Sequence, residues 1–389
     1  MGEYFRRFWH PVLLSEEVPA PDCPPVRVRL MGENLIAFRD STGKVGLVEQ
    51  YCRHRKADLF FGRNEEGGLR CAYHGWKFDL KGDCLDMPTE PPDSRLRTET
   101  KLQAYPCEEH AGMVWAYLGP KDIPVQYPQL EFNRLPKEHL FIRKSLLECN
   151  FLQALEGQFD SSHIGFLHSF LAKNQGNPQA RRRAALGGKP LSESDAGQTV
   201  RDVLPAMDIH DTDFGFMLAA KRAAANGKTY LRVTQWCLPH HTFICNPPGE
   251  TLLWDAWVPI DDTNTWVYRV SYNPWRPINE REIYEFNNAG LMPMSVQNIP
   301  GTYLPVRNRR NDYLIDRAAQ LRDESYTGIS RIPNQDRMAY ESMGEMSDYD
   351  FEHLKTSDLM ISRTRRRVFA AAEALVRDGT VPPGVDDPT

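Results

Sequence analysis

The sequence lacks the features that take a chain into a membrane or onto nucleic acid. It has no run of about 18 apolar residues, and its start, MGEYFRRFWHPV, has no apolar core of a secretory signal. Position 6, where a myristoylation site needs Ser or Thr, holds Arg6. The formal charge of −5 provides no excess of cations for a phosphate backbone. We therefore expect a cytoplasmic protein that binds neither nucleic acid nor membrane.

Cysteines are few, eight in 389 residues, and they are scattered rather than gathered into a short disulfide framework. In a reducing compartment such thiols stay free or bind metal, and most fill core positions. Only Cys52 and Cys71 have histidines at matched offsets, which separates them from the other six.

The length and the pattern of apolar residues predict two domains of an α+β protein. In the first 118 residues apolar and polar side chains alternate, as in VRVRL, with turns at Gly32, Gly43 and Lys81–Asp83. A Pro-rich connector, GPKDIPVQYPQLEFNRLPKEH, follows. We therefore predict an all-β domain at 1–120, a linker at 121–140 and a second domain at 141–389.

The second domain is predicted to combine an antiparallel sheet with helices. A helical pattern begins near Glu148, and a polar stretch rich in Gly, Pro and Ser at 172–199, which includes an arginine run, predicts a mobile loop or lid. A last helix is expected to stop at Gly379. The strand candidates are TYLRVTQWCL, TLLWDAWVPI and NTWVYRVSY.

Two short motifs in the first domain combine a thiol with an imidazole. Cys52 and His54 form CxH, and after sixteen residues Cys71 and His74 form CxxH. Mixed sulfur and nitrogen ligands suit a structural zinc ion or an iron–sulfur cluster in which two histidines replace two cysteines. The spacing favours the cluster, because zinc sites usually have wider pairs.

This segment resembles the Rieske [2Fe-2S] motif. The resemblance implies that Cys52 and Cys71 hold one iron and His54 and His74 the other, with Trp76 packed behind the second loop. The chain departs from the family at Arg53 and Lys56, where relatives usually have proline and a small residue. These cations are candidates for a docking patch that receives an electron donor.

The second domain contains a DxxHxxxxH arrangement formed by Asp160, His163 and His168. Spacing by three places Asp160 and His163 on one helical face, whereas His168 requires the helix to loosen or end, for which Gly165 is a plausible place. Two histidines and one carboxylate leave open positions on a metal, as in non-haem Fe(II) oxygenases.

The chain from FRRFWHPVLLSEEVP to ECNFLQALEG resembles Rieske oxygenase alpha subunits of the phthalate 4,5-dioxygenase branch. The resemblance implies a helix-grip, START-like catalytic domain in which His163 and His168 bind Fe(II). Asp160 would carry the electron from His74 of a neighbouring subunit. The carboxylate ligand would be Asp336 after Gln335, in preference to Glu341, Asp348, Asp350 and Asp358. Residues implied around the iron are Asn150, Gln153 and Glu156.

The same resemblance implies a homotrimer, or stacked trimers, that receives electrons from an NAD(P)H-dependent flavin and iron–sulfur reductase. The reaction would be O₂-dependent cis-dihydroxylation in aromatic hydrocarbon catabolism. An aromatic carboxylate would contact Arg232 and Ser161, and a diaryl ether is a second possible substrate. Two alternatives stay open: an O- or N-demethylating Rieske monooxygenase, and an electron carrier or zinc-stabilised domain without oxygen chemistry. The last needs neither a second domain nor DxxHxxxxH.

Overall fold

The computed structural model describes residues 2–123, 125–169, 202–224, 227–246, 249–288 and 296–385. The chain divides into two compact units, one formed by residues up to 134 with those from 374 onwards, the other by residues 135–373. The predicted loop or lid at 172–199 lies outside the described residues. The domain limits at 120 and 140 stay a prediction.

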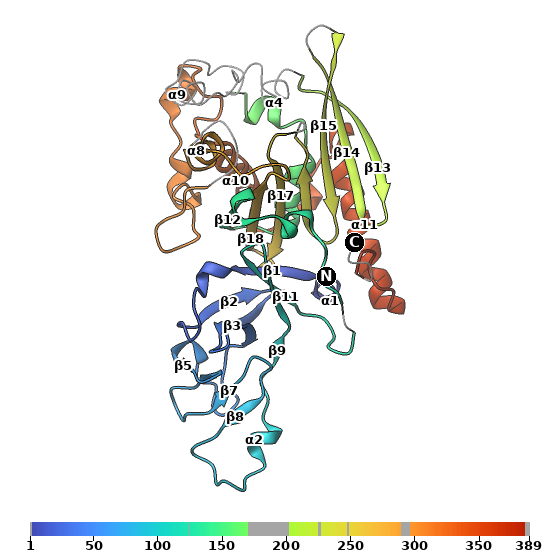
Figure 1. The fold of residues 1–389 in the computed structure, drawn as a ribbon. Coiled ribbons are helices and arrows are strands. Elements are labelled where there is room, and N and C mark those ends of the chain that lie inside the picture. Colours follow the sequence, from blue (N-terminus) through green and yellow to red (C-terminus); the bar gives the residue numbers. More distant parts are fainter. Residues whose placement is uncertain are drawn as a thin grey trace. The chain divides into compact units, whose positions relative to one another are not determined.

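The first unit contains three small antiparallel sheets (Figure 1), ordered β1-β11-β10, β2-β3-β4-β9 and β5-β6-β7-β8. The predicted alternation is confirmed in β2, where Val28 and Leu30 are buried and Arg27 and Arg29 are exposed. Its elements are α1 (Gly2–Arg6), β1 (Trp9–Leu14), β2 (Val26–Leu30), β3 (Glu33–Arg39), β4 (Val45–Glu49), β5 (Arg63–Glu65), β6 (Gly68–Arg70), β7 (Lys77–Phe78), β8 (Cys84–Asp86), α2 (Leu96–Glu99), β9 (Ala104–Tyr105), β10 (Cys107–His110) and β11 (Met113–Tyr117).

The turn predicted at Lys81–Asp83 is confirmed, and it needs glycine at its centre. Gly82 has a φ of 81°, and a Cβ there would lie 2.2 Å from the carbonyl oxygen of Leu102. Beside this turn, one apolar core joins the second and third sheets to the loops of Cys52 and Cys71. The fully buried side chains of this core include Ile36, Phe38, Val48, Leu59, Leu69 and Phe78.

The second unit is built on a seven-stranded antiparallel sheet, ordered β12-β18-β17-β16-β15-β14-β13. The three strands predicted from the sequence are confirmed as β15, β17 and β18, whereas the other four were not predicted. The strands are β12 (Leu140–Leu147), β13 (Ala206–Thr212), β14 (Gly215–Ala223), β15 (Thr229–Cys237), β16 (His241–Ile244), β17 (Leu252–Pro259) and β18 (Thr265–Tyr272).

Helices cover this sheet and bring residues that are distant in the sequence together. The helices are α3 (Phe151–Phe159), α4 (Ile164–Leu167), α8 (Glu280–Asn288), α9 (Arg317–Leu321), α10 (Ile332–Ser342) and α11 (Leu359–Asp378). Helix α3 packs against both β17 and α10. Helix α11 lies along β13 and β14 (Figure 1), where Arg367 donates to the carbonyl of Thr212 at 2.6 Å. As predicted, α11 ends at Gly379, which has a φ of 75°.

The secondary structure confirms the predicted fold class, an all-β unit followed by an antiparallel sheet with helices. None of the helices in the described ranges combines the length and the apolar character that a membrane span requires.

Candidate metal centres

Two loops of the first unit carry the four predicted ligands, Cys52, His54, Cys71 and His74. In the first loop the amide of Cys52 donates to the carbonyl of Ala57 at 2.9 Å. The carbonyl of Cys52 accepts from the amide of Lys56, also at 2.9 Å. These two bonds close a six-residue turn around His54.

The second loop closes in the same way. The amide of Cys71 donates to the carbonyl of Trp76 at 2.8 Å, and its carbonyl accepts from the amide of Gly75 at 3.0 Å. Lys56 and Gly75, at matching positions, have φ values of 59° and 78°. The two loops therefore share one hydrogen-bonding pattern, and each carries one cysteine and one histidine.

The histidine rings of the two loops meet. The ring centroids of His54 and His74 are 4.3 Å apart, and Trp76 stacks on His54 at 4.5 Å with an angle of 13° between the rings. Trp76 thus supports the histidine of the first loop rather than lying only behind the second. The Nδ1 atom of His54 is buried and has no hydrogen-bond partner in the part of the chain that the structure describes, so it is an unsatisfied donor or ligand atom.

The two thiols are also neighbours. A hydrogen bond from Cys52 lowers the pKa of Cys71 to about 6, whereas the same contact and burial raise the pKa of Cys52. Both residues are buried, with exposures of 1% and 3%. Two adjacent sulfurs, two adjacent imidazoles and an unsatisfied imidazole nitrogen form a donor set that fits a Rieske cluster.

The second candidate centre begins where α3 ends. Asp160 follows Phe159 with extended backbone angles, and its Oδ1 accepts from the amides of Ser162 at 2.8 Å and His163 at 3.1 Å. These two bonds form a turn just before α4, and His163 and His168 are the residues that flank this short helix. The predicted break at Gly165 is wrong, because Asp160 ends the first helix earlier and Gly165 lies inside α4.

Asp336, on α10, joins these two histidines. Its Oδ1 lies 3.0 Å from Nε2 of His168 and 3.7 Å from Nε2 of His163. One ligand atom from each of the three residues lies within 4.8 Å of the others. The two imidazole rings are nearly perpendicular, at 87°. The structure thus brings Asp336 to two histidines that precede it in the sequence by more than 160 positions.

Electrostatics tie the three side chains to one another. Burial lowers the pKa of His163, but the hydrogen bond with Asp160 and the charge of Asp336 outweigh it and raise that pKa overall. Burial raises the pKa of Asp336, but the nearby His168 and His163 outweigh it and lower the pKa. Both carboxylates are therefore held ionised at neutral pH, since the pKa of Asp160 is lowered too.

The donor set fits a divalent iron. Oδ1 of Asp336 is buried and has no suitably placed hydrogen-bond donor within the described ranges. Two imidazole nitrogens face the same oxygen. A 2-His-1-carboxylate set of this kind holds non-haem Fe(II) and leaves coordination positions open.

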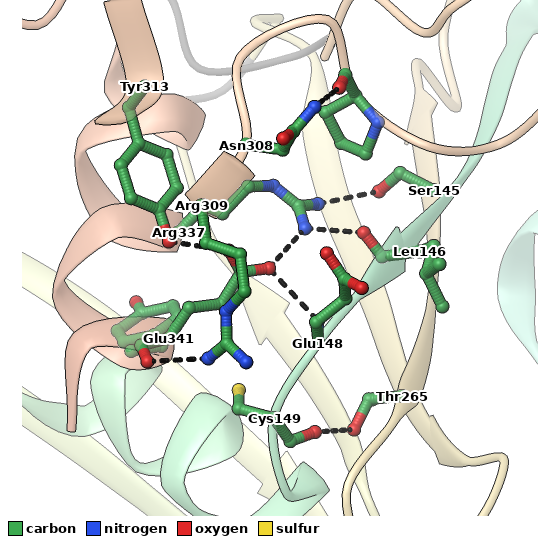
Figure 2. Close-up of polar contacts among 12 residues, drawn as sticks. Ser145, Leu146, Glu148, Cys149, Thr265, Asn308, Arg309, Tyr313, Arg337 and Glu341 are labelled. Carbon is green, nitrogen blue, oxygen red and sulfur yellow. Dashed lines mark hydrogen bonds and ion pairs between the residues drawn. The ribbon is translucent and has the colours of Figure 1, made fainter. Parts of the chain in front are cut away.

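Helix α10 is fixed in place by a buried ion pair between Arg337, which follows Asp336, and Glu341, one turn later (Figure 2). Arg337 contacts Glu341 at 2.8 Å and also donates to the carbonyl of Leu146 at the end of β12. The Glu341 carboxylate accepts from the hydroxyl of Tyr313 at 2.6 Å and from the amide of Glu148 at 2.9 Å. The network connects α10, which carries Asp336, to the strand that leads into α3.

Arg232 lies on the face of β15 that α3 covers. Side chains alternate along a strand, so Arg232 and Trp236 share a face, and Trp236 contacts Phe159 at the end of α3, with ring centroids 6.2 Å apart. The charge of Arg232 acts to lower the pKa of His163, while burial lowers the pKa of Arg232 itself. No hydrogen bond or ion pair joins its guanidinium to the described residues. This cation therefore faces the candidate iron site.

Other predicted residues have structural partners. The hydroxyl of Ser161 accepts from Arg222 at 3.0 Å. Asn150 caps α3 by accepting from the amide of Leu152 at 2.9 Å.

Gln153 donates to the carbonyls of Tyr340 and Gly344 at 2.9 and 2.8 Å. Glu156 pairs with Arg365 at 2.6 Å. Asp358, one of the alternative carboxylates, accepts from the amide of Lys355 at 2.7 Å just before α11. None of these five belongs to the three-residue cluster around Asp336.

The sequence analysis missed what Gln335 and Arg222 do. Gln335 was noted only as the neighbour of Asp336, yet its Oε1 lies 2.7 Å from Nδ1 of His168. Arg222 is 1% exposed and holds both the carbonyl and the hydroxyl of Ser161. For Arg222, the available signal was its place near the end of the strand GFMLAAKRA, on the same face as the apolar Leu218 and Ala220.

Known proteins resemble the chain along its whole length. One family model, described as the Rieske [2Fe-2S] domain, matches residues 8–106, and another, described as LigXa C-terminal domain like, matches residues 116–388. The phthalate 4,5-dioxygenase oxygenase subunit of Pseudomonas putida is 38% identical, over 96% of this chain and 83% of the relative. The 3-chlorobenzoate-3,4-dioxygenase oxygenase subunit of Comamonas testosteroni is 34% identical, over 100% and 88%. A solved fluorene-bound oxygenase and ferredoxin complex of carbazole 1,9a-dioxygenase shares the fold, with a TM-score of 0.62 and 20% identity over 98% of this chain and 93% of that one.

Proposed function

The chain belongs to the Rieske oxygenase subunits with a LigXa-like C-terminal domain, and from this membership we propose that it is the terminal oxygenase component that hydroxylates an aromatic carboxylate. The family uses a Rieske [2Fe-2S] cluster and a mononuclear iron. We keep the division into a Rieske domain at 1–120, a linker at 121–140 and a catalytic domain at 141–389 as part of the proposal.

The ligands are proposed residue by residue. Cys52 and Cys71 would hold one iron of the cluster and His54 and His74 the other, while the mononuclear iron would be bound by His163, His168 and Asp336. Together the two centres supply the electrons and the O₂ activation that no side chain provides. Dihydroxylation of a ring consumes one O₂, two electrons and two protons, so an external reductant is required.

The chain's own residues then position the reactants. The carboxylate of Asp160 accepts from the backbone amide of His163 at 3.1 Å and lies 3.5 Å from Nδ1 of the His163 ring. We propose that Asp160 also receives His74 of a neighbouring subunit, which requires a homotrimer or stacked trimers. The half-buried ring of His74, packed against the exposed Tyr73 at 3.8 Å, supports a contact with another chain at this loop.

The observation that carries the substrate class is the half-buried guanidinium of Arg232 near the iron ligands, which no hydrogen bond or ion pair joins to the described residues. A partly desolvated cation without a carboxylate partner is costly. A substrate carboxylate would offset that cost and would accept two parallel hydrogen bonds from the guanidinium. This would place the ring next to the open coordination positions. The names of the two relatives, a phthalate and a chlorobenzoate dioxygenase, agree with such a substrate.

The electron donor is proposed to be an NAD(P)H-dependent flavin and iron–sulfur reductase. The oxygenase of carbazole 1,9a-dioxygenase was solved with a ferredoxin, which supports this class of partner. Arg55, which lies over the ring of Tyr73 at 5.6 Å, provides a cation beside the cluster loops where an acidic donor would dock, whereas Arg53 is paired with Glu49. Supply of NAD(P)H agrees with the expected cytoplasmic location.

A panel of substrates tests the proposal. The purified oxygenase, with a reductase that reduces its cluster, is given benzoates, phthalates, diaryl ethers and methoxybenzoates, and product is counted per NADH consumed. We expect coupled formation of cis-diols from an aromatic carboxylate. Coupled release of formaldehyde from a methoxybenzoate, with no diol from any acid, would instead identify an O-demethylase. No coupled product from any compound would refute both.

A further inference from the structure

Gln335 is held so that only its carbonyl oxygen is left for His168. Its Nε2 donates to the carbonyl of Ile329 at 2.8 Å and to Oγ1 of Thr327 at 3.0 Å. The backbone carbonyl of Ile329 can only accept, so the nitrogen of the amide must face it. Gln335 and His168 are both buried, with exposures of 1% and 3%. The backbone at Ile329 therefore sets which atom Gln335 presents to the histidine.

This orientation fixes where the hydrogen of His168 lies. Oε1 of Gln335 can only accept, and it is 2.7 Å from Nδ1 of His168, so Nδ1 carries the hydrogen. In the neutral ring the lone pair is then on Nε2. That atom faces Oδ1 of Asp336 at 3.0 Å, an oxygen that also offers lone pairs. Two acceptors at this separation need a proton or a metal ion between them.

We propose that Gln335 is a positioning residue of the iron site, which holds His168 as the Nδ1–H tautomer and presents Nε2 to the metal. The inference rests on the proposed ligand roles of His168 and Asp336. It also distinguishes the two histidines, since Nδ1 of His163 faces the carboxylate of Asp160 at 3.5 Å and Nδ1 of His168 faces a neutral amide. His163 is thus held by a charged carboxylate, whereas His168 is oriented by a neutral amide.

Binding of Co²⁺ tests this role without turnover. The mononuclear site is emptied by chelation with the Rieske cluster retained, and Co²⁺ is titrated while its visible absorption is recorded. We expect Gln335→Leu to lose about 10- to 100-fold in affinity and to shift the Co²⁺ absorption band, because the histidine is no longer oriented. Gln335→Glu keeps an acceptor for Nδ1 but loses the donor to the carbonyl of Ile329, so its affinity should lie between those of Gln335→Leu and the wild type.

Asn308 provides a matched control. It is also a buried amide, 4% exposed, it also donates to a backbone carbonyl, that of Pro305 at 2.8 Å, and its Oδ1 accepts from the amide of Arg310 rather than from a histidine. Asn308→Leu should lower thermal stability and leave Co²⁺ affinity and absorption unchanged.

The inference is overturned if Gln335→Leu binds Co²⁺ like the wild type, or if Asn308→Leu loses the same affinity. Its failure is distinguishable from that of the proposed function. If His168→Ala also binds Co²⁺ normally, the ligand assignment itself is wrong. If His168→Ala abolishes binding and Gln335→Leu does not affect it, only the role of Gln335 is refuted.

Discussion

Lys56 and Gly75 occupy the same position in the two ligand loops. Each is the fourth residue after a cysteine, each donates its amide to the carbonyl of that cysteine, and both have positive φ, 59° and 78°. Glycine adopts this conformation without steric cost, whereas a residue with a Cβ is disfavoured by roughly 1–2 kcal/mol. The unusual lysine therefore strains the first loop at a place where the second is relaxed.

Exchanging these residues should have opposite effects. Lys56→Gly removes the strain and is expected to leave stability unchanged or raise it by up to about 1 kcal/mol, since the greater freedom of the unfolded chain offsets part of the gain. Gly75→Ala should lose about 1–2 kcal/mol or more, because its Cβ would also lie 2.8 Å from Cγ of Pro88. Thermal unfolding followed at the cluster absorption measures both. A lower midpoint for Lys56→Gly would show that the side chain of Lys56 has a stabilising role.

These loops show what the sequence could and could not provide. The spacing of Cys52, His54, Cys71 and His74 was visible because the motif is local, and so was the departure at Lys56. Its positive φ was not visible, because it depends on how the turn closes.

At the second site, DxxHxxxxH predicted that His163 and His168 lie near each other but misplaced the helix break. The side chain of Asp160 accepts from two backbone amides in the turn between α3 and α4, an interaction that helical periodicity does not describe. Asp336 was selected from the family pattern, since its contact with the histidines depends on how α10 packs. The orientation of the Gln335 amide depends on where the backbone carbonyl of Ile329 lies, and no sequence pattern gives that position.

Arg232 should control affinity for a substrate carboxylate. Arg232→Met removes a charge-assisted hydrogen bond worth about 1.5–3 kcal/mol, so KM for the preferred aromatic acid should rise roughly 10- to 100-fold. KM for a neutral aromatic ether should change little, which provides the internal control. Steady-state kinetics of the two substrates measure the difference. Equal effects on both would assign Arg232 a structural role.

The buried pair that anchors α10 should be important for stability. Glu341→Ala leaves Arg337 buried without its partner and removes the acceptor of Tyr313, which should cost about 3–5 kcal/mol in urea unfolding. Glu324→Ala breaks the exposed pair with Arg322 and should leave the midpoint unchanged. Similar midpoints for the two variants would contradict the anchoring role of this network.

Asp160→Asn should separate electron transfer from metal binding. The amide oxygen of asparagine can still accept from the amides of Ser162 and His163, so α4 and both metals are expected to stay in place. Loss of the charge should slow the single-turnover reaction of the reduced enzyme at least about 10-fold. Iron content and the rate of product formation in one turnover check this, and a normal rate would exclude Asp160 from the proposed path.

The central claim is that one chain carries a Rieske cluster and a separate mononuclear iron site. Iron content and electron paramagnetic resonance of the reduced protein, compared between the wild type and His163→Ala, test it most directly. The wild type should hold about three irons per chain, two of them in the cluster, and show a Rieske-type signal. His163→Ala should keep that signal, lose about one iron and form no product. A colourless wild type that holds zinc and shows no signal, or a His163→Ala variant that retains activity, would contradict the account.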